Sequence, residues 1–132
     1  MKQTAGHNHA VIWIDHRQAR IFYVGRTGSD QIVLKSEHSG QHIHHKANSI
    51  GSGHAAEDRN YLKSAAAALA GLGTILVLGP SVEKFVFHNF LRDYNRATFN
   101  AIVAVESSDH QSDNQIIALA RRHFNLAEVR SA

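Results

Sequence analysis

The chain has 132 residues, of which 43% are hydrophobic and one is proline, and this is the composition of a single globular domain. The absence of cysteine excludes disulfides and thiolate chemistry, and the lack of a signal-peptide core or of a run of about 18 apolar residues predicts a soluble, cytoplasmic protein with no membrane partner. The net charge of +3 and the eleven histidines favour an anionic partner, although so small an excess also serves solubility alone.

The first third of the chain predicts a three-stranded antiparallel meander. β-Branched and aromatic residues fill 11–15 (VIWID) and 19–24 (ARIFYV), and the three residues between these runs are typical of a hairpin. Residues 25–30 (GRTGSD) are turn formers, and 31–36 (QIVLKS) predict a third strand.

The middle of the chain predicts a helix and a buried strand. The alanine-rich stretch 55–70 has Glu57 and Asp58 in its expected first turn and Gly71 after its end, which is typical helix punctuation. Residues 74–78 (TILVL) are wholly apolar and predict a strand buried on both faces. Gly79, Pro80 and Ser81 then end this strand.

Two further helices and a strand are expected after residue 81. The second helix carries an apolar stripe at helical spacing, which we expect to be buried: Val82, Phe85, Val86 and Phe90. Residues 99–105 (FNAIVAV) predict the fifth strand. Ser112 and Gln115 form a capping box for the last helix, whose expected apolar face is Ile116, Ile117, Ala120 and Phe124.

The predicted order is therefore β-β-β-α-β-α-β-α. It indicates one α/β domain with a five-stranded mixed sheet over residues 11–126. Residues 1–10 are expected to form a flexible N-terminus and residues 127–132 a C-terminal tail.

Several polar segments are expected to meet at one edge of this sheet. If the first, third, fourth and fifth strands run in one direction, their carboxyl ends lie together, where α/β sheets bind ligands. The N-termini of all three helices would also point there and favour an anion such as phosphate, although Glu57 and Asp58 would oppose it. The segments concerned are 15–17, 38–54, 79–81 and 106–110.

The stretch 38–54 is the main candidate for a binding loop. It holds five of the eleven histidines together with Lys46 and several glycines, and loops of this length are usually functional or disordered. We predict phosphate contacts from His42, His44, His45 and Lys46, with Arg17 from the neighbouring turn. The three histidines could also bind a metal ion, but their spacing matches no established motif, so no metal is predicted.

The end of this stretch, Ile50 to His54, is rich in glycine and precedes the expected helix. Such a tract lets the backbone of Gly51, Ser52 and Gly53 approach a phosphate closely, or it serves only as a flexible hinge. It is not a Walker loop, because no Gly-Lys-Ser/Thr follows. His54 is a tentative general base, for which the sequence offers no oriented partner.

Four carboxylates follow the expected strands: Asp15, Glu106, Asp109 and Asp113. They could hold metal ions for phosphodiester cleavage. Turn formation, solvation of strand ends and helix capping explain the same positions, and this is the interpretation we prefer.

The order of these segments resembles a family of translation proteins. VIWID, ARIFYV, TILVLGPSVEKFVFHNFL and IVAVESSDHQSDNQIIALA, from about Val11 to Phe124, are similar to the middle domain of the eukaryotic and archaeal class-1 peptide-chain release factor and of Pelota. The stretch HHKANSIGSGHA, from His44 to Ala55, resembles short bacterial translational machinery proteins more closely.

The resemblance implies a ribonuclease H-like fold and a translation-related role. In the release factor the equivalent loop ends in a Gly-Gly-Gln tip that promotes peptidyl-tRNA hydrolysis at the ribosome. Here the corresponding residues are Gly51, Ser52, Gly53 and His54, without the glutamine. Pelota also lacks the tip and acts in ribosome rescue.

The chain is therefore expected to bind the ribosome or structured RNA, without a cofactor and not primarily as an enzyme. Two alternatives stay open. One is a hydrolase, acting on the peptidyl-tRNA ester through His54 or on phosphodiesters with metal. The other is a protein-interaction module, including a homodimer.

Overall fold

The computed structural model describes residues 8–25, 29–36 and 50–125, and in the first helix the side chains are described from Arg59 onward. His42, His44, His45 and Lys46 lie outside these ranges. None of the helices in the described ranges has the length and hydropathy that crossing a membrane requires.

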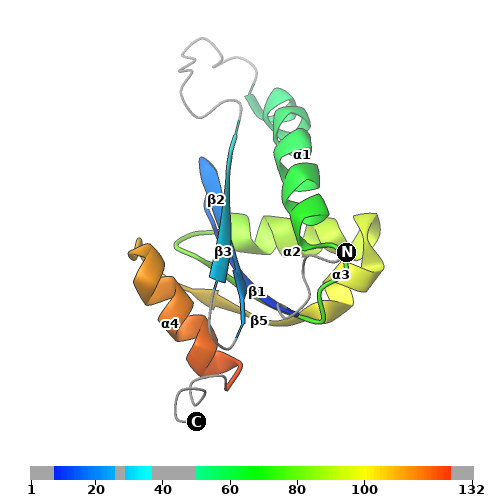
Figure 1. Cartoon of the computed structure of the whole chain (residues 1–132). Coiled ribbons are helices and arrows are strands. Elements are labelled where there is room, and N and C mark those ends of the chain that lie inside the picture. The colour runs from blue at the N-terminus through cyan, green and yellow to red at the C-terminus, as the bar shows by residue number, and fades with distance from the viewer. Residues whose placement is uncertain (1–7, 26–28, 37–49, 126–132) are drawn as a thin grey trace.

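One five-stranded mixed sheet forms the centre of the molecule, as predicted (Figure 1). The strands lie in the order β3-β2-β1-β4-β5; β1 pairs antiparallel with β2 and β2 with β3, whereas β4 runs parallel to β1 and β5 parallel to β4. Four strands therefore share one direction, as expected. The strands are β1 (His9–Ile14), β2 (Gln18–Val24), β3 (Ser29–Lys35), β4 (Thr74–Gly79) and β5 (Ile102–Ser107).

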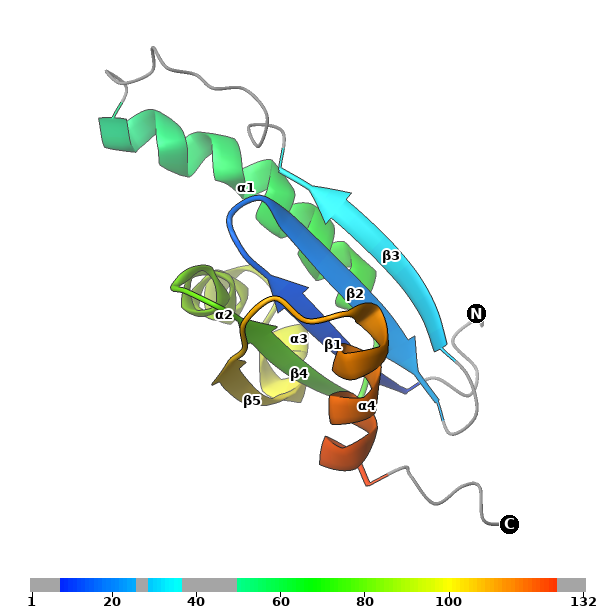
Figure 2. The same cartoon turned by 90° about the vertical axis from the view of Figure 1, so that its left-hand side faces the viewer.

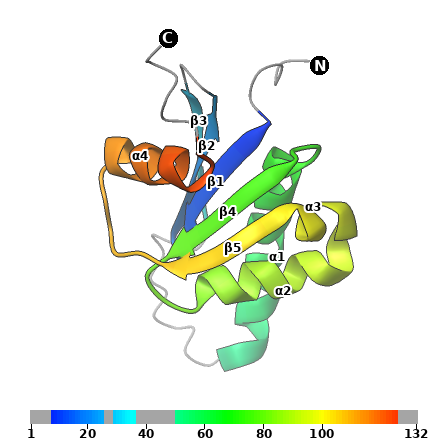
Figure 3. The same ribbon diagram turned by 90° about the horizontal axis from the view of Figure 1, so that it is seen from below.

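Helices cover both faces of this sheet (Figures 1 and 3). Alternate residues of β1 point to opposite sides, so that Ile12 joins a core cluster with α1 and α2, whereas Trp13 joins a second cluster with α4. The helices are α1 (Ile50–Leu69), α2 (Glu83–Tyr94), α3 (Arg96–Ala101) and α4 (Asp113–His123). The capping box of Ser112 and Gln115 is confirmed, and Ile116 and Ala120 are buried as expected.

The first helix begins earlier than the sequence indicates. Residues 50–54 form its first turns, so the interpretation of the glycine tract as a loop or hinge is wrong. Glycine costs a helix only about 1 kcal/mol relative to alanine, and each added residue gains one hydrogen bond once the helix is nucleated. Glu57 and Asp58 consequently lie beyond the first turn, which contains no acidic residue.

The predicted stripe on the second helix does not face the core. Val82, Phe85 and Val86 are 65%, 49% and 41% exposed, while Phe87 and Leu91 are fully buried in their place. Phe90 is partly buried against the core, as expected. Both sets recur at helical spacing, so the period of the pattern did not determine which face packs on the sheet.

The predicted fifth strand begins too early. Residues 96–101 form the additional helix α3, and β5 starts only at Ile102. The side chain of Asn95 caps this helix by accepting a hydrogen bond from the Thr98 N–H at 3.1 Å. The observed order is therefore β-β-β-α-β-α-α-β-α.

Candidate functional site

A pocket of about 420 Å³ lies at the carboxyl edge of the sheet. It is formed by the turn between β1 and β2, the end of β3, the loop after β4 and the loop after β5, so the expected convergence of these segments is confirmed. Eight residues line it: Asp15, His16, Arg17, Gln18, Lys35, Pro80, Ser81 and His110.

Asp15 organises the turn that forms one side of this pocket. One carboxylate oxygen, Oδ1, accepts hydrogen bonds from the backbone N–H groups of Arg17 at 2.8 Å and Gln18 at 3.0 Å. The Asp15 carbonyl accepts a hydrogen bond from the Tyr61 hydroxyl of α1 at 2.8 Å. The residue is only 6% exposed. Because these hydrogen bonds hold its backbone and Oδ1, the other carboxylate oxygen, Oδ2, has a fixed direction.

His110 faces this carboxylate from the loop after β5. Its Nε2 lies 3.6 Å from Asp15 Oδ2, and its ring packs on the Trp13 ring with a centroid distance of 4.6 Å. The Trp13 side chain is itself fully buried and donates a hydrogen bond from Nε1 to the Asp109 carbonyl at 3.1 Å. The imidazole is therefore oriented by two neighbours while its side chain stays 69% exposed.

The loop after β4 forms the opposite side of the pocket and is tightly fixed. A Cβ atom at Gly79 would lie 2.3 Å from the Ile14 carbonyl oxygen, so no other residue fits there without a backbone shift. The Gly79 carbonyl accepts a hydrogen bond from the Ser108 N–H at 2.9 Å. The buried Lys84 side chain donates from Nζ to the Ser81 carbonyl at 2.5 Å. Pro80 and Ser81 thus have a defined position.

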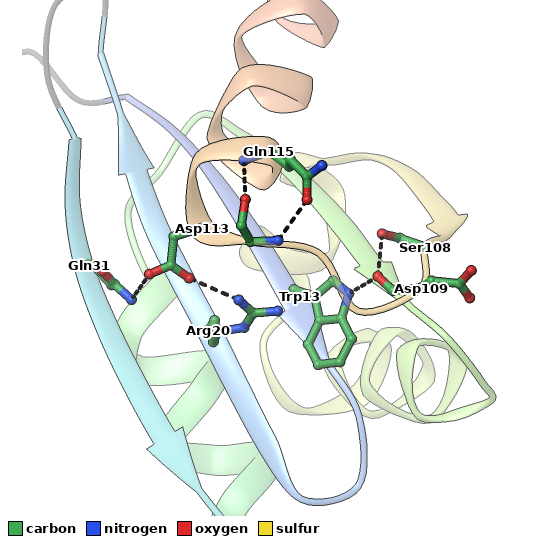
Figure 4. Close-up of polar contacts among 8 residues, drawn as sticks. Trp13, Arg20, Gln31, Ser108, Asp109, Asp113 and Gln115 are labelled. Atoms are coloured by element: carbon green, nitrogen blue, oxygen red, sulfur yellow. Dashed lines mark hydrogen bonds and ion pairs between the residues drawn. The ribbon is translucent and has the colours of Figure 1, made fainter.

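The last helix begins away from the pocket, which its first residue does not line. Its first residue, Asp113, lies over the middle of the sheet, where it accepts hydrogen bonds from Arg20 of β2 at 2.8 Å and Gln31 of β3 at 3.1 Å (Figure 4). The Arg20 guanidinium in turn lies 4.8 Å from the centroid of the Trp13 ring. Helix α1, by contrast, extends beyond the sheet at its N-terminal end, on the side where β3 ends (Figure 2).

Three of the four carboxylates that could have held metal ions have separate partners. Asp15 binds its own turn and His110, Asp113 binds Arg20 and Gln31, and Glu106 lies 3.7 Å from His123 Nε2. The described residues contain no cluster of three or more potential metal ligands.

Of the predicted site residues, the structure places Arg17 in the pocket. Gly51, Ser52 and Gly53 belong to the first turn of α1, and His54 follows them, but their side chains lie outside the described residues. Two features were not predicted, Lys35 as a pocket residue and the Asp15–His110 pair. Lys35 ends its strand opposite Gln18, and this position at the end of a strand could have indicated a pocket residue. No local pattern indicates that the loop after β5 turns back over Trp13.

The described residues therefore define an α/β domain with a basic pocket at the carboxyl edge of a mixed sheet. No protein-family model and no curated protein sequence matches the chain. Solved structures of translation proteins share its fold.

Pelota from Thermoplasma acidophilum superposes with a TM-score of 0.62 at 16% identity, over 90% of this chain and 34% of that protein. The archaeal translation termination factor aRF1 gives a TM-score of 0.59 at 15% identity, over 86% of this chain and 33% of that protein. Dom34 of S. cerevisiae, a translation termination-like factor, gives 0.53 at 10% identity, over 86% and 32%. The chain thus spans about a third of the length of these proteins.

Proposed function

We propose that this chain is a translation-related domain that binds ribosomal or other structured RNA through the pocket at the edge of its sheet. We further propose that it corresponds to the middle domain of Pelota and of class-1 release factors. The fold likeness supports a role in translation, because the similar structures are a termination factor and Pelota-type proteins. A cytoplasmic location follows from this proposal.

The observation that best supports RNA as the partner is the positive charge of the pocket. Arg17 and Lys35 line it, together with two histidines that add charge when protonated, and Asp15 is the one carboxylate among its eight residues. This carboxylate already accepts hydrogen bonds from its own turn. Cationic side chains gathered in this way are the usual means of binding phosphate groups, and arginine binds them with two parallel hydrogen bonds.

We propose that residues outside the described ranges extend the contact surface. The described chain stops at Ser36, whose N–H donates to the Arg17 carbonyl at 2.9 Å, and it resumes at Ile50 on the same side of the sheet. We propose that His42, His44, His45 and Lys46, which lie between these points, add phosphate contacts. The amides of Gly51 and Ser52, in the first turn of α1, have no acceptor within the helix and can do the same. We propose a further contact from Gly53.

Binding to a fluorescently labelled RNA hairpin and to purified ribosomes tests the proposal. We expect the Arg17→Ala/Lys35→Ala variant to bind at least about tenfold more weakly than the unmodified chain. The slope of log affinity against log salt should fall by about 1 for each phosphate contact removed. An Arg92→Ala/Arg122→Ala variant is the matched control, because it loses the same charge from exposed positions that do not line the pocket.

The result that contradicts the proposal is clear. If neither RNA nor ribosomes bind at low salt, or if the control variant weakens binding as much as the pocket variant, the pocket is not an RNA site. The role of His54 as a general base stays a prediction, which is tested by comparing peptidyl-tRNA hydrolysis by the unmodified chain and the His54→Ala variant. The homodimer also stays a prediction, and light scattering tests it.

A further inference from the structure

The same pocket carries a set of side chains that binding alone does not require. Two histidines, His16 and His110, reach it from different segments of the chain, and Arg17 and Lys35 stand beside them. We propose that this pocket cleaves RNA without a metal ion, by transferring the phosphodiester to the neighbouring 2′-hydroxyl. This inference rests on the proposed RNA binding and adds a reaction to it.

His110 has the surroundings of a general acid. Asp15 Oδ2 lies 3.6 Å from His110 Nε2, and because Oδ1 is taken by the amides of Arg17 and Gln18, Oδ2 is the oxygen directed at the histidine. A carboxylate in this position orients the ring. With Nε2 facing Asp15, the other ring nitrogen, Nδ1, is the atom that can donate a proton to a substrate in the pocket.

His16 is suited to the opposite role. It precedes Arg17 in the turn, is exposed, and lines the same pocket, but the Asp15 carboxylate pairs with His110 and not with this neighbour. A neutral imidazole that faces a phosphodiester can accept a proton from the ribose 2′-hydroxyl. The two histidines therefore differ in that only His110 faces the Asp15 carboxylate. We assign His110 as the acid and His16 as the base on this difference.

The proposed step balances without any co-reactant. His16 removes the proton of the 2′-hydroxyl, the 2′-oxygen forms a bond to phosphorus, the bond from phosphorus to the 5′-oxygen breaks, and His110 Nδ1 protonates that leaving oxygen. Arg17 and Lys35 stabilise the negative charge that builds on the phosphoryl oxygens. The products are a 2′,3′-cyclic phosphate and a free 5′-hydroxyl.

The size of the pocket fits this substrate. Its volume of about 420 Å³ lies within the roughly 300–1,000 Å³ of small-ligand sites, so it can admit one nucleotide and the phosphate that follows. The 2′-oxygen must approach phosphorus from the side opposite the leaving 5′-oxygen. A rigid duplex does not allow this movement, so the substrate is flexible single-stranded RNA or an RNA loop.

The experiment uses an oligonucleotide that is deoxyribose throughout except for one ribose, incubated with the chain in excess EDTA. We expect cleavage only after the ribose, with a 2′,3′-cyclic phosphate identified by mass spectrometry, and no cleavage when that ribose carries a 2′-O-methyl group. His16→Ala and His110→Ala should each lower the rate by about 10²- to 10⁴-fold.

A modified substrate separates the two histidines. If the leaving 5′-oxygen is replaced by sulfur, which departs without protonation, His110→Ala should regain most of its activity and His16→Ala should not. Asp15→Asn should likewise lose activity on the ordinary substrate and regain most of it with the sulfur leaving group, because it removes the carboxylate that faces His110 Nε2. This readout distinguishes a positioning role of Asp15 from a purely structural one.

His123→Ala is the matched control, because His123 also faces a carboxylate, Glu106 at 3.7 Å, but does not line the pocket. It should cleave like the unmodified chain. RNA that binds but is not cleaved overturns this inference and leaves the proposed function intact, whereas absence of binding overturns both. Cleavage that survives in both pocket histidine variants also overturns it, since the activity then comes from elsewhere.

Discussion

Gly79 shows how single positions fix the pocket. A Cβ atom there would come within 2.3 Å of the Ile14 carbonyl oxygen, a distance at which the backbone of β1 or β4 must move. We expect Gly79→Ala to lower the free energy of unfolding by about 1–3 kcal/mol, measured by urea denaturation. Gly73→Ala is the control, because its methyl group would meet only the side chain of Asn8. Equal losses in both variants would contradict this reason.

The residues of the pocket were predictable to different degrees. Asp15, His16 and Arg17 follow a strand, and His110 follows the last one, so the common direction of the strands was enough to bring them to one edge. The Asp15–His110 pair was not predictable. It depends on the path of the loop after β5, which the contact between Trp13 and the Asp109 carbonyl helps to fix, and such contacts between distant residues leave no local pattern.

At the scale of the elements, helix α2 offers a direct comparison between two phenylalanines. Phe87 is fully buried and belongs to the core cluster shared with β1 and α1, while Phe85 is 49% exposed. We expect Phe87→Ala to cost about 3–5 kcal/mol of unfolding free energy, and Phe85→Ala about 1 kcal/mol or less. Urea denaturation of both variants measures the difference. A larger loss for Phe85→Ala would mean that the helix packs through its other face.

This comparison also shows what the sequence could not decide. The hairpin, the strand TILVL and the capping box of α4 were predictable because turn residues, β-branched runs and caps act locally. The face of α2 was not, since Val82, Phe85 and Val86 on one side and Phe87 and Leu91 on the other are equally apolar at helical spacing. The start of α1 was missed because cooperative helix growth outweighs two glycines.

At the scale of the whole molecule, the sheet couples distant parts of the chain. His9, at the start of β1, bonds through Nδ1 to the Thr74 hydroxyl of β4 and stacks on Phe124 after α4, with ring centroids 4.8 Å apart. His88 of α2 stacks on Phe99 of α3 at 4.7 Å. These two histidines therefore link the first and last elements and the two neighbouring helices, so their ionisation bears on the stability of the entire fold.

Burial lowers the pKa of His9 below its usual value of 6.5, and burial followed by the positive charge of Arg92 lowers the pKa of His88. Both rings thus stay neutral in the folded chain at a pH where the unfolded chain already binds protons. Because the unfolded state takes up more protons, the free energy of unfolding should fall as the pH drops below 6.5, until the folded rings also become charged.

Urea midpoints measured from about pH 8 to about pH 5 at constant ionic strength test this expectation. The His9→Gln/His88→Gln variant should lose stability less steeply over that range, because neither glutamine titrates. His123→Gln, which removes a histidine that faces Glu106 at 3.7 Å, is the control and should keep the steep dependence. If the double variant follows the same curve as the unmodified chain, other groups are responsible for the pH dependence, and the neutral state of His9 and His88 does not determine it.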